Sequence, residues 1–433
     1  MEDRSSASGR PDSAGFVLDV AVPRGPSFRH AHIEATGAYV TAFQRDRYDV
    51  VIAGARCAGA ATALLLARSG LRVLVVDPLR YGSDTLSTHA LMRGAVLQLH
   101  RWGLLDEVRS SGAPPVRSTT FHYGDETIEV LIKPRDGVDA LYAPRRTVLD
   151  PVLVDAARES GAEFAFGASV TGLVRDREGR VRGATVAHGE TEPTDILADL
   201  VIGADGIRSR VARVLDAPTE YETPHAACSI YGYWQAVPMR GYHWFYDIGV
   251  SIGTIPTNDG DTCVFALLPQ ALFMDRRDEG IATLFHEAVA AVSPELAEHV
   301  RTTKPSGKLR AFPGYRGFLR RAVGPGWALV GDAAYFRDPI TAHGITDALR
   351  EAELLSHAIV GNGGDALSDY QSTRDERVRG LLDVTDRIAS FDWDLEEAKE
   401  HHLELNRQMK AQVEVLRDLY QAGADPPTAA VRA

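Results

Sequence analysis

The sequence feature that most constrains the fold lies between Tyr48 and Asp77. It reads YDVVIAGARCAGAATALLLARSGLRVLVVD: an apolar run, a glycine-bearing turn at Gly54 to Gly59, an alanine- and leucine-rich helical segment, and a second apolar run that ends in an acid. This order predicts a strand, a phosphate-binding turn, a helix and a second strand, as in dinucleotide-binding domains. Small residues let the backbone approach a pyrophosphate, the amino end of the helix carries partial positive charge, and the terminal acid accepts ribose hydroxyls.

One position departs from the GxGxxG fingerprint, because Arg56 stands where the middle glycine is expected. Its side chain either points away from the pyrophosphate or lies along it as an added cation, and the sequence leaves both open. A strand-helix-strand unit without a ligand is the alternative interpretation. The place of Asp77 after the second strand favours the dinucleotide site.

Composition excludes several classes of protein. The 433 residues predict two or three domains, and 47 basic against 59 acidic residues give a net charge of -12 without a basic stripe. Nucleic acid and an anionic membrane surface are therefore not expected as partners. We predict a cytoplasmic protein with no signal peptide, no membrane span and no metal site. The three cysteines are scattered, which argues against disulfides and for a reducing compartment: Cys57, Cys228 and Cys263.

Outside this first unit, residue composition and hydrophobic alternation distinguish an N-terminal extension from two strand-rich segments. Residues 1–46 are rich in Ser, Gly, Pro and Arg and predict a flexible extension. Residues 117–143 and 226–270 read as strands that do not alternate with helices. They predict a second, largely antiparallel sheet inserted between pieces of the nucleotide-binding domain.

Two later segments support the first one. In LVIGADGIRSRVAR (200–213) a buried strand runs into Asp205 and Gly206 and then into a helix, a pattern that also suits a simple turn capped by the acid. In WALVGDAAYFRDPITAHGITDA (327–348) a strand runs into Asp332, and a helix begins near Gly344. An acid at a strand end can hold a ribitol or ribose hydroxyl, and a helix amino end can stabilise negative charge on a ring. Each motif is weak alone, but the three in this order are specific.

With these segments the chain resembles the FAD-dependent monooxygenases of the aromatic-hydroxylase class, the group of para-hydroxybenzoate hydroxylase. The wider superfamily includes flavin halogenases and geranylgeranyl reductases. The resemblance covers about residues 48–215 and 325–360 and implies an α/β fold. The expected parts are a doubly wound, Rossmann-like FAD-binding domain (47–116, 144–222 and 322–388), an inserted, mainly antiparallel β substrate domain (117–143 and 223–321), and a helical C-terminal tail (389–433).

The resemblance also implies the cofactor contacts. Asp77 would bind the adenosine ribose, Val170 the adenine through its backbone, Arg146 the phosphate or ribityl region and Asp332 the ribityl chain. The loop from Pro339 would border the isoalloxazine ring. Tyr335, Thr341 and Thr346 depart from the family pattern. The expected cofactor-binding residues are Gly54, Ala55, Arg56, Cys57, Ala58, Gly59, Asp77, Pro78, Arg80, Arg146, Val170, Asp205, Gly206, Asp332, Pro339, Ala342, His343, Gly344 and Ile345.

The implied function is hydroxylation or epoxidation of an aromatic or polycyclic small molecule through a flavin 4a-hydroperoxide, with O2 as co-substrate and NADPH or NADH as electron donor. This chemistry needs little acid-base help, so the catalytic candidates are single histidines, each of which can equally be structural: His343, His89 and His243, with His122 as a further base. Five aromatic residues line a pocket for a planar substrate or pack across strands: Tyr231, Tyr233, Trp234, Trp244 and Tyr246.

Three alternatives stay open at this point. A halogenase needs a lysine near the flavin, and none of the lysines is close to the flavin loop in sequence. An isoprenoid reductase needs a long apolar tunnel, which the sequence does not distinguish from a pocket. A non-catalytic flavin module would not need the large aromatic domain. The sequence also leaves open a separate reductase, a homodimer, and a tail that covers the substrate domain or forms a dimer contact.

Overall fold

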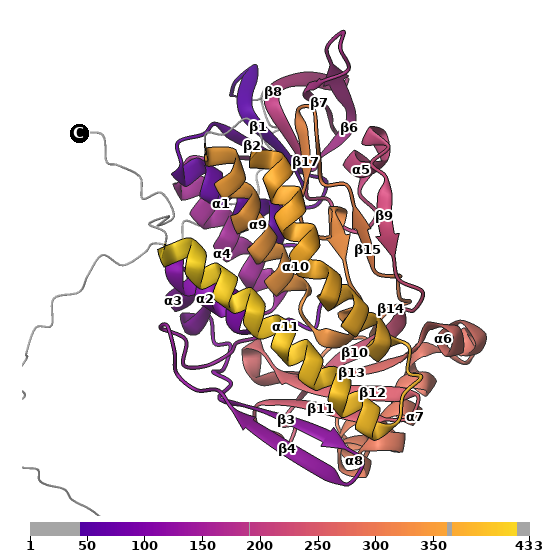
Figure 1. Ribbon diagram of the computed structural model, residues 1–433. Coiled ribbons are helices and arrows are strands. Elements are labelled where there is room, and N and C mark those ends of the chain that lie inside the picture. The colour runs from indigo at the N-terminus through magenta and orange to yellow at the C-terminus, as the bar shows by residue number, and fades with distance from the viewer. Residues whose placement is uncertain (1–43, 190, 362–365, 422–433) are drawn as a thin grey trace, which may run out of the picture. The chain divides into compact units, whose positions relative to one another are not determined.

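The computed structural model describes residues 44–189, 191–361 and 366–421, all within one compact unit that starts at Gln44. The predicted N-terminal extension therefore lies almost wholly outside the described residues. The described strands form three sheets, and helices flank them (Figure 1).

The first sheet has a parallel centre with the order β17-β8-β1-β2-β5. Its strands are buried on both faces, which explains the unbroken apolar runs. Helices α1 and α9 pack against each other, and α1 also packs on α4. Strands β16, β7 and β6 extend the sheet. The bounds are β1 Arg47–Ala53, α1 Cys57–Arg68, β2 Val73–Asp77, α4 Arg146–Glu159, β5 Glu163–Phe166, β6 Ala168–Arg175, β7 Val181–His188, β8 Thr194–Gly203, β16 Val323–Gly324, β17 Trp327–Leu329 and α9 Gly344–Val360.

The second sheet has the order β14-β10-β13-β12-β11-β3-β4 and is antiparallel except for the parallel pair β3 and β11. Helices α6, α7 and α8 cover one of its faces and bury a core that includes Trp234 and Phe285. The bounds are β3 Ser118–Tyr123, β4 Glu126–Leu131, β10 Ala227–Gln235, β11 Tyr242–Asp247, β12 Val250–Pro256, β13 Asp261–Pro269, α6 Gln270–Arg276, α7 Ile281–Val292, α8 Pro294–Thr302 and β14 Arg310–Phe312.

The C-terminal helices cover other parts of this unit. Helix α11 packs along α10 and reaches the second sheet, where the ring of His402 lies 4.2 Å from that of Tyr246, centroid to centroid (Figure 1). The tail therefore covers the sheet face opposite α7. The remaining bounds are α2 Arg93–Arg101, α3 Leu105–Ser110, α5 Arg210–Leu215, β9 Thr219–Glu222, η1 Asn258–Gly260, η2 Arg277–Glu279, β15 Phe318–Arg320, η3 Gly331–Ala333, β18 Tyr335–Phe336, η4 Pro339–Thr341, α10 Ala366–Ala389 and α11 Leu395–Gln421.

The expected fold class is confirmed: a doubly wound α/β domain, an inserted and mainly antiparallel sheet, and a helical tail. None of the helices described has the length and apolar character that a membrane crossing requires. Within the same residues, His, Cys, Asp and Glu side chains nowhere gather in threes as metal ligands.

Candidate functional site

The turn between β1 and α1 requires a glycine at Gly54, where the backbone after β8 passes close by. Gly54 has φ 107°, and a Cβ there would overlap the carbonyl oxygen of Ala204. Helix α1 begins at Cys57 with no side-chain cap and no acid in its first turn. Its first N–H groups, together with the helix dipole, therefore favour an anion.

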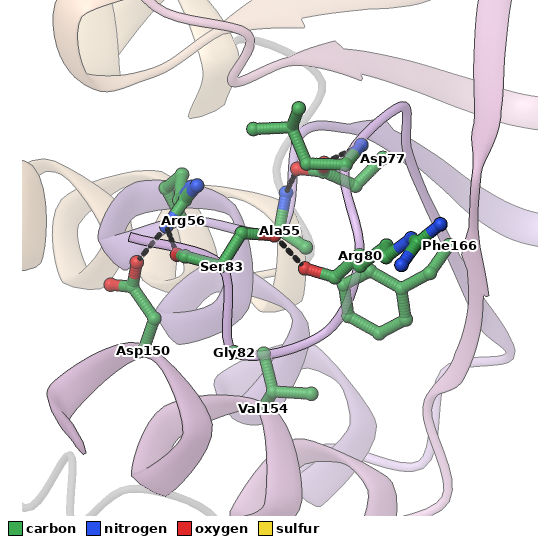
Figure 2. A pocket seen from close by; sticks show the side chains of 10 residues that line it. Ala55, Arg56, Asp77, Arg80, Gly82, Ser83, Asp150, Val154 and Phe166 are labelled. Carbon is green, nitrogen blue, oxygen red and sulfur yellow. Dashed lines mark hydrogen bonds and ion pairs between the residues drawn. The ribbon is translucent and has the colours of Figure 1, made fainter. Parts of the chain in front are cut away.

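Asp77 ends β2 beside this turn. One of its carboxylate oxygens accepts a hydrogen bond from the Ala55 N–H at 2.7 Å, and the other accepts one from the Leu79 N–H at 2.8 Å. Asp77 lines a small pocket that Phe166 and Val154 also border (Figure 2). The loop residues Pro78 and Arg80 are exposed at its edge, and Val170 is buried in β6, paired with Val186 of β7.

The structure shows where the unexpected Arg56 points. Its guanidinium donates to the Ser83 carbonyl oxygen at 2.5 Å and to the Asp150 carboxylate at 2.8 Å (Figure 2), and also to the Asp84 carbonyl oxygen at 3.2 Å. The side chain is thus turned toward α4 and the loop after β2, where it remains a cation beside the phosphate-binding turn.

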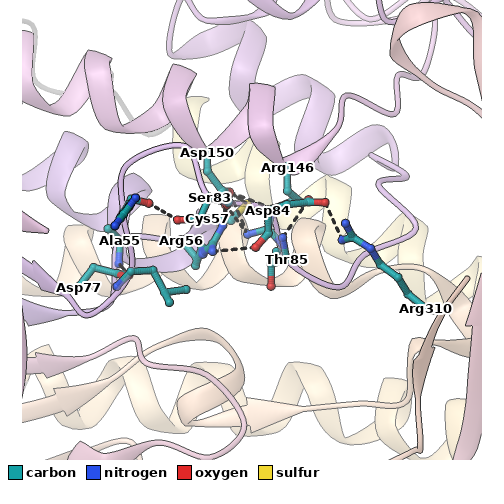
Figure 3. A network of polar contacts seen from close by, with 12 residues as sticks. Ala55, Arg56, Cys57, Asp77, Ser83, Asp84, Thr85, Arg146, Asp150 and Arg310 are labelled. Carbon is teal, nitrogen blue, oxygen red and sulfur yellow. Dashed lines mark hydrogen bonds and ion pairs between the residues drawn. The ribbon is translucent and has the colours of Figure 1, made fainter. Parts of the chain in front are cut away.

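Asp150 is the centre of a polar network at this turn (Figure 3). Besides Arg56, it accepts two hydrogen bonds from Arg146, at 2.9 and 3.1 Å, and one from the Cys57 thiol at 3.3 Å. Burial raises the pKa of Cys57, so the thiol stays protonated. One carboxylate between two guanidinium groups leaves one net positive charge beside the amino end of α1.

The two later acids differ in their surroundings. The Asp205 carboxylate accepts hydrogen bonds from the Ser209 hydroxyl and from the N–H groups of Arg210 and Val211, at 2.5, 2.7 and 3.1 Å. It therefore holds the first turn of α5, as the simpler interpretation of the sequence expects, and Gly206 follows with φ 80°. Asp332 is half-buried, and none of the described residues donates a hydrogen bond to it. Burial raises its pKa to about 7, although the nearby Arg146 opposes the shift.

The loop before α9 leaves a second helix amino end open. Helix α9 has no side-chain cap, although Asp347 lies in its first turn, and apart from the neighbouring residues and the helix's own backbone no atom lies within 4 Å of the point where a Cβ on Gly344 would sit. Pro339 and Ala342 are half-buried in this loop, and Ile345 is buried in the first turn of α9. The His343 ring is buried, and its Nδ1 donates to the Thr341 carbonyl. Burial, with Arg337, lowers its pKa to about 3, so the ring is neutral.

A buried group of charges under this loop was missed in the sequence. Asp347 accepts hydrogen bonds from Arg337 and Arg350, both at 2.7 Å, and all three side chains are almost fully buried. The signal was present, since Asp347 and Arg350 are three residues apart on a helix that is otherwise largely apolar.

The loop after β2 joins the nucleotide turn to the second sheet. Nε2 of His89 lies 2.6 Å from the Tyr233 hydroxyl, and the Ser87 N–H donates to the Tyr231 hydroxyl at 3.2 Å. Asp84 of the same loop forms an ion pair with Arg310 of β14 at 2.6 Å (Figure 3). Two of the predicted aromatic residues therefore contact this loop, and one of them, Tyr233, contacts the predicted histidine His89.

The other predicted residues are divided between the two faces of the sheet. Side chains alternate along a strand, so Tyr231, Tyr233, Trp244 and Tyr246 lie on the face opposite α7. Trp234 lies on the α7 face, stacked on Phe285.

His243 lies on the same face of the sheet as Trp234, the face that α7 covers. Its Nδ1 lies 3.1 Å from Nε2 of His122, and its Nε2 donates to the Arg240 carbonyl at 2.9 Å. The structure does not bring His243 together with His89, because the sheet separates them.

Two curated relatives are similar to this chain in sequence. A menaquinone reductase of Mycolicibacterium smegmatis is 26% identical over 356 residues, covering 75% of this chain and 79% of its own. Digeranylgeranylglycerophospholipid reductase 1 of Methanococcoides burtonii is 26% identical over 338 residues, covering 70% and 72%.

Solved structures show the same fold at lower identity. PqsL, a probable FAD-dependent monooxygenase from Pseudomonas aeruginosa, has a TM-score of 0.70 at 20% identity and covers 84% of this chain and 100% of its own. The flavin-dependent brominase Bmp2 has a TM-score of 0.68 at 20% identity and covers 88% and 94%.

The residues present fit FAD. Two helix amino ends lack side-chain caps, the guanidinium groups of Arg56 and Arg146 lie beside the first of them, and the Asp332 carboxylate is free to accept ligand hydroxyls. Residues 47–385 match the family model of the FAD binding domain, and the chain is therefore a member of that family and an FAD-dependent oxidoreductase.

Proposed function

We propose that this protein is a monooxygenase that hydroxylates or epoxidises an aromatic or polycyclic small molecule, with O2 as co-substrate and NADH or NADPH as electron donor. One observation carries the proposal: the sheet face that meets the loop after β2 is aromatic. Tyr231 pairs across the strands with Phe265, and Gly253 separates Phe265 from Trp244. Any side chain on Gly253 would collide with the Phe265 ring, which lies over it. A sheet face rich in aromatic side chains suits contact with the planar ring of a substrate.

Each part of the site has a role in this proposal. FAD supplies the redox chemistry with oxygen when it is bound. The amino end of α1, with Arg56 and Arg146, would hold the pyrophosphate, Asp77 the ribose and Asp332 the ribityl chain. The amino end of α9 would stabilise negative charge on the ring.

Helix α11 excludes water from the far end of the aromatic face. His402 lies against Tyr246, and its Nδ1 is 3.1 Å from the Tyr123 hydroxyl. Exclusion of water protects reactive species formed during oxygen chemistry.

A second candidate is reduction of a carbon-carbon double bond in an isoprenoid chain. It is supported by the menaquinone reductase and the digeranylgeranylglycerophospholipid reductase, which align over 70% or more of this chain. Halogenation is a third candidate function. Its support is weaker, because the brominase shares the fold with this chain at only 20% sequence identity.

The test is oxygen consumption by the FAD-loaded protein with NADH or NADPH, in the presence of phenolic, polycyclic or menaquinone substrates, followed by product mass. Monooxygenation adds one oxygen atom to an aromatic product. A gain of two hydrogen atoms by menaquinone that remains after the quinol has been reoxidised to the quinone, and so lies in the isoprenoid chain, would overturn the proposal in favour of the reductase; a bromide-dependent product would favour the halogenase.

Two tryptophans give a matched pair of variants. Trp244→Leu removes an aromatic ring from the proposed substrate face and should raise KM for the aromatic substrate. Trp234→Leu removes one from the opposite face and should lower stability without changing KM. Equal effects on KM would argue against this face as the substrate site.

A further inference from the structure

Strand β4 is an open edge of the second sheet. It is the last strand in the sheet order, and all six of its residues are exposed (Figure 1). The strand at the opposite edge, β14, has three residues, and each of them is half-buried. A long, exposed edge strand presents unpaired N–H and C=O groups and readily pairs with another strand. Strand β4 is therefore a candidate interaction surface.

The hydrogen bonds to β3 show which backbone groups of β4 point outward. The N–H of Ile132 donates to the Arg117 carbonyl at 2.8 Å, so the even-numbered residues of this segment face β3. The N–H and C=O groups of successive residues point to opposite sides of a strand. Those of Thr127, Glu129 and Leu131 therefore point away from the sheet, where none of the described strands pairs with them.

The strand also exposes apolar side chains. Ile128 is 39% and Val130 is 44% exposed. They lie on the α11 side of the sheet, because Ile128 is opposite Phe121, whose ring centroid lies 6.3 Å from that of His402. Leu131 points to the other side and is 66% exposed. A partner strand would cover apolar surface on both sides of this edge.

Glu129 and Lys133 flank Leu131 with opposite charges. Both are exposed, and neither forms a salt bridge with another described residue. If two copies of the strand run antiparallel about a two-fold axis at Leu131, each Leu131 lies opposite its own copy, and each Glu129 lies opposite Lys133 of the second copy.

The backbone fits the same register. Glu129, Leu131 and Lys133 are all odd-numbered, so their backbone groups point toward the second copy. The Lys133 carbonyl accepts a hydrogen bond from Arg93 at 2.7 Å and has a second lone pair for the partner strand. This register is thus self-complementary in hydrogen bonds, in charge and at its apolar centre.

We propose that two copies of this chain form a dimer in which β4 pairs antiparallel with β4, with Leu131 on the two-fold axis. The second sheets of the two copies then form one continuous sheet, and the interface is the same patch on both. A strand pair of this length is smaller than a standard protein interface, so we expect a Kd on the order of 10 μM. The dimer does not depend on the proposed chemistry, because no residue of β4 is assigned to the site.

The first test is sedimentation of the FAD-loaded full chain over a concentration series. We expect a reversible monomer–dimer equilibrium in the native protein. Glu129→Lys places lysine opposite lysine at both flanks, and Lys133→Glu places glutamate opposite glutamate, so each should raise the Kd about tenfold or more. Asp125→Lys makes the same change of charge as Glu129→Lys, but in the exposed turn outside the paired segment, and should leave the Kd unchanged.

The second test exchanges the two charges. The double variant Glu129→Lys with Lys133→Glu should dimerise as the native protein does, and an equimolar mixture of the two single variants should form a heterodimer. Recovery of either kind also shows that the single variants are folded. A native protein that is monomeric about tenfold above the expected Kd would overturn the proposal. A dimer that the single variants do not weaken, or that the exchange does not restore, would overturn it as well.

Discussion

Replacing Asp150 by asparagine should test the charge balance at the phosphate-binding turn. The carboxylate accepts hydrogen bonds from Arg146, which is only 8% exposed, and from the more exposed Arg56. Removing one partner of a buried ion pair costs about 3–5 kcal/mol, because the other charge stays buried. Arg56 can turn toward water, so we assign the loss to Arg146 and expect about 3 kcal/mol in the FAD-free protein.

FAD should recover part of that loss. Its pyrophosphate would bring negative charge to the guanidinium groups that Asp150→Asn leaves unpaired, and a hydrogen bond to a charged group contributes about 1.5–3 kcal/mol. The measurement is urea-induced unfolding followed by circular dichroism, with and without excess FAD. As a control, Asp106→Asn removes an ion pair with Arg109 in which the aspartate is 88% exposed, and it should have no measurable effect. Equal losses with and without FAD would refute the assignment of the pyrophosphate to this turn.

Three further predictions concern stability. Trp234→Ala empties the core under α7, where the ring is 1% exposed and stacked on Phe285, and should cost about 3–5 kcal/mol in thermal or urea unfolding; a loss below about 1 kcal/mol would contradict the packing. Arg337→Met removes one of the two 2.7 Å partners of the buried Asp347 carboxylate, which keeps Arg350, and should cost about 1.5–3 kcal/mol in urea unfolding; no loss would contradict the role of this buried pair. His343 has a folded-state pKa of about 3, below its unfolded value, so its neutral ring stabilises the protein above about pH 6.5 and that contribution falls as pH drops toward 3. Relative to His343→Gln, the native protein should therefore lose about 1.4 kcal/mol between about pH 7.5 and about pH 5.5, and a constant difference would contradict the shift.

The fold was largely predictable because its signals are local. The apolar runs, the tight turn at Gly54 and the helix that follows lie within one short stretch, and each local preference agrees with the others. The parallel pairing of β3 with β11 was not evident, since it joins strands more than a hundred residues apart and depends on the route of the chain between them.

The site was predictable only in part, and the reason is distance along the chain. His89 and Tyr233 are separated by 144 residues, so no spacing pattern relates them. Trp234 and Trp244 look alike in sequence, but the packing of α7 decides which face of the sheet is core and which meets the loop after β2. Arg56 was open for the same reason, because its partner Asp150 comes from a different helix.

The most direct test of the proposed function is the fate of isotopically labelled O2. FAD-loaded protein would be supplied with NADH or NADPH and an aromatic substrate that accelerates oxygen consumption, and the product would be examined by mass spectrometry. We predict one labelled oxygen atom in the aromatic product, and less of it in Trp244→Leu at low substrate concentration. An unlabelled product, or saturation of a double bond in the isoprenoid chain of menaquinone with no oxygenated product, would contradict the monooxygenase assignment.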